Sequence, residues 1–382
     1  MKRLVLAGAG HAHALVLQQW ARAPLPGVEL VVVSPHAHAP YSGMVPGWLA
    51  GRYRFDEIVI DFAALCARAG ARWIAGEVQA VDPQRGRLAL ADGPELAWDL
   101  LSLNIGSTLR PPELGHARVL ALRPLAALRP AWEAELARWQ ADRSGAPFRV
   151  TAVGGGAAGV ESLLAVAAAL RAHRSDGSGR PRRPGRPGRP LVLRLVSRAP
   201  RLLAELCEPA QRAAHRALAR AGVQVQLDTP WHAALDADSD LVMWAAGAQA
   251  HDWMLDPARR GGLAVSAQGF VRVDAQLRSI SHPQVHAAGD CAHWQAPGPQ
   301  ATGLPKAGVH AVRMGPVLAQ NLRAALGHGR ARTLQPQRHF LVLLSTADGR
   351  AIAARGAFGA SGAWAWWWKE RIDRGFVARF RP

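Results

Sequence analysis

The sequence has few cysteines and no long apolar segment. Its three cysteines, Cys66, Cys207 and Cys291, lie far apart and form no C-x-x-C motif, which excludes a disulfide framework and a paired-cysteine zinc site. A reducing, cytoplasmic location is therefore expected. No run of about 18 apolar residues occurs, so a transmembrane helix is not expected, and the glycines near the N-terminus argue against a signal peptide.

Lysine is also scarce. Only three of the 46 basic residues are lysine, and the formal net charge is +18. A basic surface favours anionic partners such as dinucleotides, acidic lipid or nucleic acid, but charge does not choose among them. The segment 173–190, composed almost wholly of Arg, Pro, Gly and Ser, is predicted to be a disordered insert, with a nucleic-acid or lipid-binding arm as the alternative.

The N-terminal region has the pattern of a dinucleotide-binding turn. Residues 3–7 (RLVLA) predict a buried parallel strand, and the turn that follows contains Gly8 and Gly10 before a helical stretch. Gly8 permits the bend, Gly10 lets the backbone approach a pyrophosphate, and the helix N-terminus attracts that anion. His13 replaces the third glycine and is expected to crowd the helix. Ser34 stands where an acidic residue usually binds the ribose.

A second, complete motif lies in the middle of the chain. Residues 148–153 predict a strand, Gly154, Gly156 and Gly159 form G-x-G-x-x-G, and a strong helix former follows. We therefore expect a second dinucleotide here. Arg198, after the next strand, stands where Arg favours the phosphate of NADPH and Glu favours NADH, although a solvated arginine is the alternative.

Two such units in one chain suggest a flavin and a nicotinamide held for hydride transfer. A later strand ending in Gly-Asp would place an Asp on FAD, and Asp290 closes such a segment. The chain resembles the two-dinucleotide-binding flavoproteins, which include pyridine nucleotide-disulfide reductases, type II NADH dehydrogenases and sulfide:quinone oxidoreductases. The segments that carry this resemblance are VLAGAG (5–10), SLNIGS (102–107), VGGGAAGVE (153–161), LVMWAAGA (241–248) and HAAGDCA (286–292).

A closer resemblance is to the oxidoreductase module often found fused to selenide, water dikinase. This resemblance makes selenide, water dikinase a candidate partner, and it accounts for the histidines in the first turn. The segments that carry it are GAGHAHALVL (8–17), PYSGMVPG (40–47), LPKAGVHAVRMGPVLAQNL (304–322) and WAWWWKERIDRGFVARF (364–380).

These resemblances imply an α/β fold with two Rossmann-like dinucleotide-binding domains and a C-terminal cap. The expected FAD domain is split between 1–115 and 249–330, the NAD(P) domain is 116–248, and the cap is 331–382. The expected cofactors are FAD and either NADH or NADPH. The residues expected at FAD are Gly8, Gly10, His11, Ser34, Gly106 and Asp290, and those at NAD(P) are Gly154, Gly156, Gly159 and Arg198.

Disulfide reduction is not expected, because residues 41–44 (YSGM) carry no cysteine pair where such reductases need one. Electrons must then pass to a diffusible acceptor, and the resemblance to type II NADH dehydrogenases implies a quinone or a similar small carrier. The resemblance implies that Lys306 lies beside the flavin ring, where its charge would stabilise reduced flavin. It also implies that Glu161 faces the nicotinamide. The alternatives are a surface lysine and a carboxylate placed only by the helix dipole.

Two histidine pairs raise a metal hypothesis. His11 and His13, like His36 and His38, have a spacing at which imidazoles can converge on one ion, but no nearby carboxylate or thiolate completes a site. No metal is expected. His11 and His13 are instead expected at the flavin pyrophosphate or packed beneath the helix.

The C-terminal segment 364–380 predicts an amphipathic basic helix. Its apolar positions recur every fourth residue, and basic side chains including Lys369 lie elsewhere around the helix. One interpretation is peripheral contact with the inner face of a membrane. The other is that the stripe packs on the FAD domain. The apolar positions are Trp364, Trp368, Ile372, Phe376 and Phe380.

The sequence thus predicts an FAD-dependent NAD(P)H oxidoreductase similar to type II NADH dehydrogenases. The alternative is a redox-linked partner protein of selenium metabolism. Nucleic acid is not expected as a partner, because two dinucleotide turns would then have no role.

Overall fold

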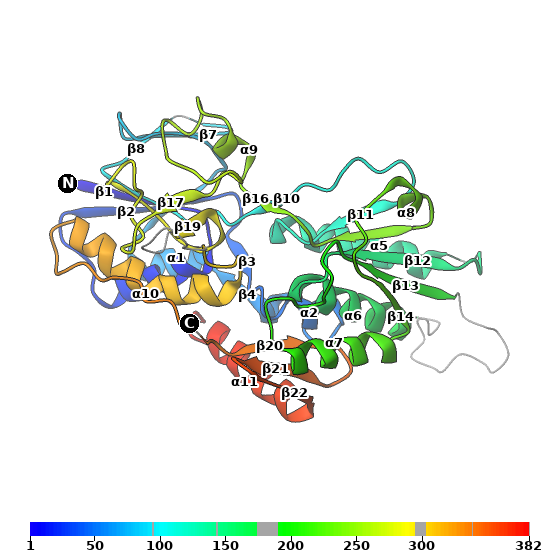
Figure 1. Cartoon of the computed structure of the whole chain (residues 1–382). Helices are drawn as coiled ribbons and strands as arrows, with labels where there is room; N and C mark the ends of the chain where they lie inside the picture. The colour runs from blue at the N-terminus through cyan, green and yellow to red at the C-terminus, as the bar shows by residue number, and fades with distance from the viewer. Residues whose placement is uncertain (94, 143, 174–189, 295–302, 338, 382) are drawn as a thin grey trace.

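The computed structural model describes residues 1–93, 95–142, 144–173, 190–294, 303–337 and 339–381. Apart from its two end residues, the predicted insert 173–190 lies outside the described residues. Two parallel sheets and a C-terminal layer make up the described chain (Figure 1).

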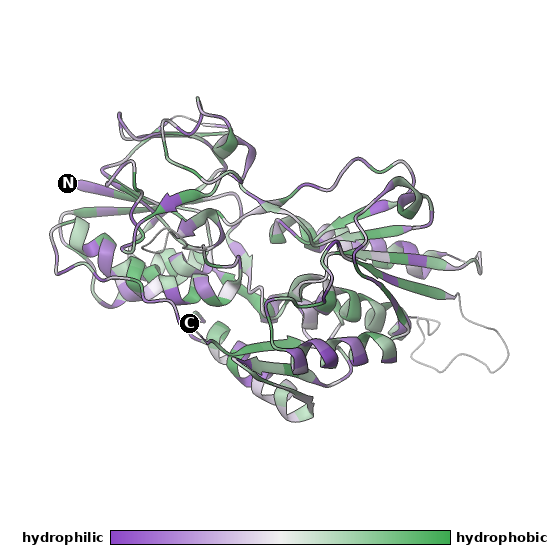
Figure 2. Ribbon diagram, viewed as in Figure 1, coloured by the Kyte–Doolittle hydropathy of each residue, from purple (hydrophilic) through white to green (hydrophobic). Residues whose placement is uncertain are grey.

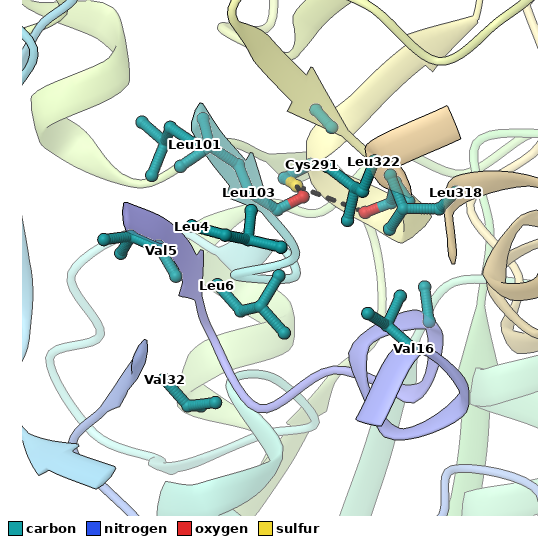
Figure 3. Close-up of a cluster of buried hydrophobic side chains, with 14 of the residues drawn as sticks. Leu4, Val5, Leu6, Val16, Val32, Leu101, Leu103, Cys291, Leu318 and Leu322 are labelled. Atoms are coloured by element: carbon teal, nitrogen blue, oxygen red, sulfur yellow. Dashed lines mark hydrogen bonds between the residues drawn. The ribbon is translucent and has the colours of Figure 1, made fainter. Parts of the chain in front are cut away.

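The first sheet has five parallel strands that come from two separated parts of the chain. Its strands are buried along most of their length, as is usual for a parallel sheet. Figure 3 shows Leu4 and Leu6 beside Leu318 and Leu322, which are fully buried. Each such leucine contributes about 1.5–3 kcal/mol. In spatial order the strands are β18 (Val285–Ala287), β9 (Leu100–Leu103), β1 (Lys2–Ala7), β2 (Val28–Ser34) and β5 (Arg72–Ala75), and helices α1 (His11–Arg22), α4 (Phe62–Ala69) and α10 (Gly308–Ala325) accompany them.

The second sheet also has five parallel strands, and all of them come from one continuous stretch. In Figure 2 its strands and the first helix after the second glycine turn are mainly hydrophobic, as expected for buried elements. In spatial order the strands are β11 (Arg118–Ala121), β15 (Leu241–Trp244), β12 (Phe148–Val153), β13 (Leu191–Val196) and β14 (Val223–Gln226), with helices α5 (Leu125–Ala141), α6 (Ala157–Ala172), α7 (Glu208–Arg220) and α8 (Ala233–Ala237).

The chain passes between the two sheets twice. The two crossing segments pair with each other as short antiparallel strands, β10 (Thr108–Leu109) and β16 (Ala248–Gln249). The predicted α/β class with two Rossmann-like units is therefore confirmed.

The C-terminal layer is an antiparallel sheet of β20 (Val342–Ser345), β21 (Ala351–Arg355) and β22 (Phe358–Gly362), followed by helix α11 (Ala363–Ala378). It lies beneath the junction of the two units (Figure 1). Strand β22 packs on α7 and β20 on α6, while Phe376 and Phe380 join the core of the first unit. The predicted C-terminal cap is confirmed, and it touches both units.

Smaller elements complete the described chain. None of its helices has the length and apolar character needed to cross a membrane. The remaining strands and helices are β3 (His38–Pro40), β4 (Val59–Asp61), β6 (Val78–Asp82), β7 (Arg87–Leu90), β8 (Leu96–Ala97), β17 (Val271–Val273), β19 (Ala292–Trp294), α2 (Val45–Leu49), α3 (Phe55–Ile58), α9 (Asp252–Leu255) and the 3₁₀ turn η1 (Gly289–Cys291).

Candidate functional site

The first glycine turn joins β1 to α1. Gly8 has φ +100°, a backbone conformation that side chains rarely adopt, and its N–H donates to the carbonyl of Val33. Gly10 is the N-cap residue of α1 and, as a glycine, has no side chain to cap the helix. The N-terminus of α1 therefore lies at the carboxyl edge of the first sheet, where an anion is favoured.

Asn104, just after β9, organises this turn, and the sequence analysis did not single it out. Its Oδ1 accepts hydrogen bonds from the N–H groups of Ala12 (3.1 Å) and His13 (3.3 Å), and its Nδ2 donates to the carbonyl of Ala288 (2.6 Å). A Cβ on Gly10 would collide with this amide. The close approach of Asn104 is thus a reason for glycine at position 10 that the sequence analysis missed, and the approach of a pyrophosphate there stays a prediction.

The two histidines of the turn have different surroundings. His13 is fully buried, its Nδ1–H donates to the carbonyl of Gly8 (2.7 Å), and its Nε2 accepts from Ser102 (2.8 Å). Burial lowers the pKa of His13 to about 4, so the ring is neutral at pH 7. His13 therefore packs beneath α1, and the helix still forms above it. His11 instead turns its ring toward Tyr41 and Phe376, with centroids at 5.3 and 6.2 Å.

Asp290 lies in η1 and links the two units. Its carboxylate pairs with the guanidinium of Arg123, which also donates to the hydroxyl of Ser107. Arg123 follows β11 of the second sheet, so the pair crosses between the units. Burial lowers the pKa of His11, and the negative charge of Asp290 opposes that shift, which places His11 in the same electrostatic environment.

Lys306 lies between η1 and α10. Its Nζ donates to the carbonyl of Ala292 (2.5 Å) and lies 3.9 Å from the centroid of the Phe270 ring. Burial lowers the pKa of Lys306 to about 8, while Cys291 and Asp290 oppose the change. The interpretation as an isolated surface lysine is therefore wrong.

Ser34 and Gly106 flank the first turn at the same edge of the sheet. Ser34 ends β2, and its hydroxyl donates to the carbonyl of His36 (3.3 Å). Gly106 has φ +77°, and nothing lies within 4 Å of the position a Cβ would take. The edge therefore offers open backbone beside the turn, and this shape fits an extended dinucleotide.

The second turn joins β12 to α6. Gly154 has φ +122°, and a Cβ on Gly159 would collide with the carbonyl oxygen of Gly154, so the helix packs closely on the turn. Gly156, the N-cap residue, has open space where a Cβ would stand, which fits a phosphate at the helix N-terminus. Arg198 is exposed after β13.

Glu161, in the second turn of α6, meets the C-terminal cap. Its carboxylate accepts a hydrogen bond from the N–H of Ser345 in β20 (2.6 Å). Burial raises the pKa of Glu161 to about 7, and the charge of Lys369 opposes this shift. The helix dipole is thus only part of the environment of Glu161. The orientation of the Glu161 side chain toward a nicotinamide stays a prediction.

Lys369 was expected on the exposed basic side of the C-terminal helix, and that expectation is wrong. Its Nζ forms an ion pair with Asp373 (2.8 Å) and donates to the carbonyl of Gly43 (2.7 Å). Both side chains are less than a tenth exposed. The reason is that α11 lies against segment 41–44, so this side of the helix faces protein.

The apolar stripe of the same helix is partly buried and partly exposed. Phe376 and Phe380 are buried in the core of the first unit, as the packing interpretation predicts. Trp364, Trp368 and Ile372 are 40 to 47% exposed. The N-terminal half of the helix therefore presents an aromatic surface to solvent.

All three cysteines are free. Cys291 is buried beneath η1, where its Sγ lies 3.4 Å from the carbonyl oxygen of Leu103 (Figure 3). Burial raises the pKa of Cys291 to about 11 and that of Cys66 to about 12, so both remain thiols at neutral pH. Across the described chain, no group of three or more metal-ligating side chains is present.

A cavity of about 920 Å³ runs along α10. Its lining combines apolar side chains such as Leu15 and Leu304 with the cations Arg313 and Arg332. His310 lies at the N-terminal end of α10, and its buried Nε2 has no hydrogen-bond partner among the described residues. Burial and then the charge of Arg313 lower the pKa of His310, and the charge of Asp290 opposes that shift.

Comparison with known proteins agrees with this arrangement. A family model described as pyridine nucleotide-disulphide oxidoreductase matches residues 2–315. No curated protein matches the chain in sequence. Several solved structures share the fold at low identity.

The sulfide:quinone oxidoreductase of Aquifex aeolicus is similar with a TM-score of 0.76 at 15% identity, covering 100% of this chain and 92% of that chain. The NDH2 of Plasmodium falciparum in complex with NADH has a TM-score of 0.73 at 12% identity, covering 99% and 97%. The water-forming NADH oxidase of Lactobacillus brevis bound to NADH has a TM-score of 0.67 at 18% identity, covering 93% and 75%.

Proposed function

The chain belongs to the pyridine nucleotide-disulphide oxidoreductase family, and we propose that it oxidises NAD(P)H through FAD and passes the electrons to a quinone or another small acceptor without a redox disulfide. FAD and a nicotinamide dinucleotide are the cofactors of this family. One observation carries the proposal: two parallel sheets of one chain each end in a glycine turn that leads into the N-terminus of a helix.

FAD, when bound, accepts a hydride from NAD(P)H and returns two electrons to the acceptor. We place its pyrophosphate at the turn of α1 and its ring where segment 41–44 meets the start of α10. These two segments touch, since a Cβ on Gly308 would lie 2.7 Å from Oγ of Ser42. The residues that would hold FAD are Gly8, Gly10, His11, Ser34, Gly106 and Asp290.

The nicotinamide dinucleotide would lie at the second turn. Gly154, Gly156 and Gly159 would hold its pyrophosphate, and Arg198 would meet the adenosine end. We propose the domain limits accordingly, with an FAD domain of 1–115 and 249–330, an NAD(P) domain of 116–248 and a cap of 331–382. Lys306 would place a positive charge beside the ring.

The thiols do not take part in this scheme. Cys66 and Cys291 are buried, and neither lies in segment 41–44. Reduction of a quinone to a quinol takes two electrons and two protons, one proton arriving with the hydride and one from solvent. The acceptor site near the ring must therefore offer apolar surroundings to the quinone ring and polar groups to its oxygens.

We propose that the cavity along α10 admits the acceptor. His310 offers an unpartnered ring nitrogen to a quinone oxygen, and the apolar lining suits the quinone ring. The name of the similar Aquifex aeolicus protein includes a quinone. Replacing His310 with Leu should raise the KM for a quinone analogue about tenfold and leave flavin reduction by NADH unchanged. Slower flavin reduction in this variant would contradict the placement.

The aromatic surface of α11 supports a second proposal, contact with a membrane. Trp364, Trp367 and Trp368 are exposed, and Arg371 lies 6.0 Å from the Trp367 ring. Tryptophan and arginine together suit the boundary between lipid headgroups and acyl chains. A protein bound to the membrane through this surface could reach a quinone in the membrane.

The experiment that tests the proposed function is the visible spectrum of the purified protein under anaerobic conditions. Bleaching of bound flavin by NADH or NADPH, followed by recovery with a quinone analogue, is the expected result. Flavin that neither nucleotide reduces would refute the oxidoreductase assignment. That outcome would favour a redox-linked partner of selenium metabolism, tested by binding to selenide, water dikinase.

A further inference from the structure

The buried ion pair of the C-terminal helix has no role in the proposed function so far. Among the described residues, Lys369 and Asp373 form the ion pair whose two side chains are least exposed, at 7 and 8%. Burying two charges costs several kcal/mol each before their attraction is counted, and an apolar pair of similar volume is often as stable. Stability alone therefore gives little reason for this pair.

The pair lies where three parts of the molecule meet. Lys369 donates to the carbonyl of Gly43, in the segment on which we place the flavin ring. Glu161, from the helix of the second glycine turn, lies close enough to affect Lys369 electrostatically. Tyr41 forms a hydrogen bond with Asp373 and packs against Phe376 at 4.6 Å.

Other charged groups surround this cluster. Tyr53 faces the cluster from the loop after α2, and Glu370 and Arg374 face it from the outer side of α11. Arg52 lies over the ring of Trp366. Arg374 pairs with both Glu370 (3.1 Å) and Glu57 (3.2 Å), so its positive charge is neutralised at the rim. Lys369 is left as the buried cation between the carboxylates of Glu161 and Asp373.

Composition points to the same residue. The chain has 43 arginines and three lysines, and two of those lysines, Lys306 and Lys369, are buried or partly buried beside the proposed ring site. An ammonium is a compact point charge on a flexible stem, whereas a guanidinium is wide and planar. The presence of lysine rather than arginine at these two positions fits a requirement for a small cation.

We propose that Lys369 is a positioning residue of the redox site: held by Asp373 and Gly43, it fixes segment 41–44 beneath the flavin ring and keeps a positive charge where the two dinucleotides meet. This inference rests on the proposed function. It makes the C-terminal cap part of the redox site, which the two glycine turns alone do not complete.

The charge of Lys369 has a defined effect on the reaction. Hydride transfer moves two electrons and one proton from the nicotinamide to the ring, so the nicotinamide gains a positive charge and the ring gains a negative one. No other proton is released or taken up in that step. A fixed cation nearby stabilises the reduced ring and raises its midpoint potential.

The test is the midpoint potential of the bound flavin in the full-length, FAD-loaded protein, measured by equilibration with redox dyes. Lys369→Met should lower the equilibrium constant for flavin reduction by about tenfold, which for two electrons is about 30 mV. Lys369→Arg, which keeps the charge but not the compact shape, should restore only part of this loss. Asp373→Asn removes the opposing charge and should shift the potential in the other direction.

The matched control is Arg371→Met, which removes an exposed cation from the same helix. It should leave the potential unchanged. A Lys369→Met protein with lower melting temperature and an unaltered potential would show a structural role only and overturn the inference. So would equal shifts in Lys369→Met and Arg371→Met. If Lys369→Met does not hold FAD, the sign of the Asp373→Asn shift decides.

The dye measurement needs no nicotinamide. Failure of NADH and NADPH to reduce the wild-type flavin would refute the proposed function and leave the potential of each variant measurable. An unchanged potential in a protein that both nucleotides reduce would overturn the role of Lys369 alone.

Discussion

Replacing Glu161 with Gln should change how the stability of the protein depends on pH. In the folded chain burial raises the pKa of this carboxyl from 4.5 to about 7. Folding therefore takes up a proton between these two values, because the folded carboxyl is protonated where the unfolded one is ionised. Stability from this group is complete below about pH 4.5 and is lost as pH rises through about 7.

The size of the effect follows from the same values. A difference of about 2.5 pKa units at about 1.4 kcal/mol each gives at most about 3.5 kcal/mol. For a chain of 382 residues the unfolding entropy is roughly 0.8 kcal/mol per degree, so the melting temperature should change by about 4 °C. Gln keeps an oxygen that accepts the hydrogen bond from Ser345 and removes the titration.

The assay compares melting temperatures of FAD-loaded wild-type and Glu161→Gln protein from pH 5 to pH 8. Wild type should lose about 3 °C relative to the variant as pH rises across this range, because part of the effect lies below pH 5. Glu208→Gln, at an exposed glutamate paired with Arg212, is the control and should run parallel to wild type. A constant difference between wild type and Glu161→Gln would refute the buried environment of Glu161.

Three further predictions concern the cofactor and membrane contacts. Asp290→Ala should weaken FAD binding at least about tenfold, read from flavin content after gel filtration, because a charged hydrogen-bonding group is lost; full retention of flavin would show that the Gly-Asp segment does not hold it. Arg198→Glu should raise the KM for NADPH about tenfold and change that for NADH less; equal changes would remove Arg198 from the adenosine site. Trp364→Ser with Trp368→Ser should reduce co-sedimentation with vesicles of acidic lipid several-fold and leave the flavin spectrum unchanged, whereas unchanged co-sedimentation would exclude this surface.

The two glycine turns could be predicted because their requirements are local. A buried strand, a glycine in a left-handed conformation and a helix follow one another within about 15 residues, and Gly8 and Gly154 have the conformations that this order demands. The α/β class and the C-terminal helix follow from similar local patterns. The lack of a cysteine pair in segment 41–44 was also readable directly from the sequence.

The contacts between side chains inside the site depend on tertiary structure and could not be predicted from the sequence. Asn104, Arg123 and Lys369 lie outside the two glycine turns, and each acts on a partner more than 90 residues away, at α1, at Asp290 and at Gly43. A polar side chain in an isolated helix or loop has no pattern that reveals such a partner. Lys369 shows this most clearly, because helical periodicity placed it on a solvated basic face. Only the packing of the cap across both units turned that face toward protein and made its charge a buried one.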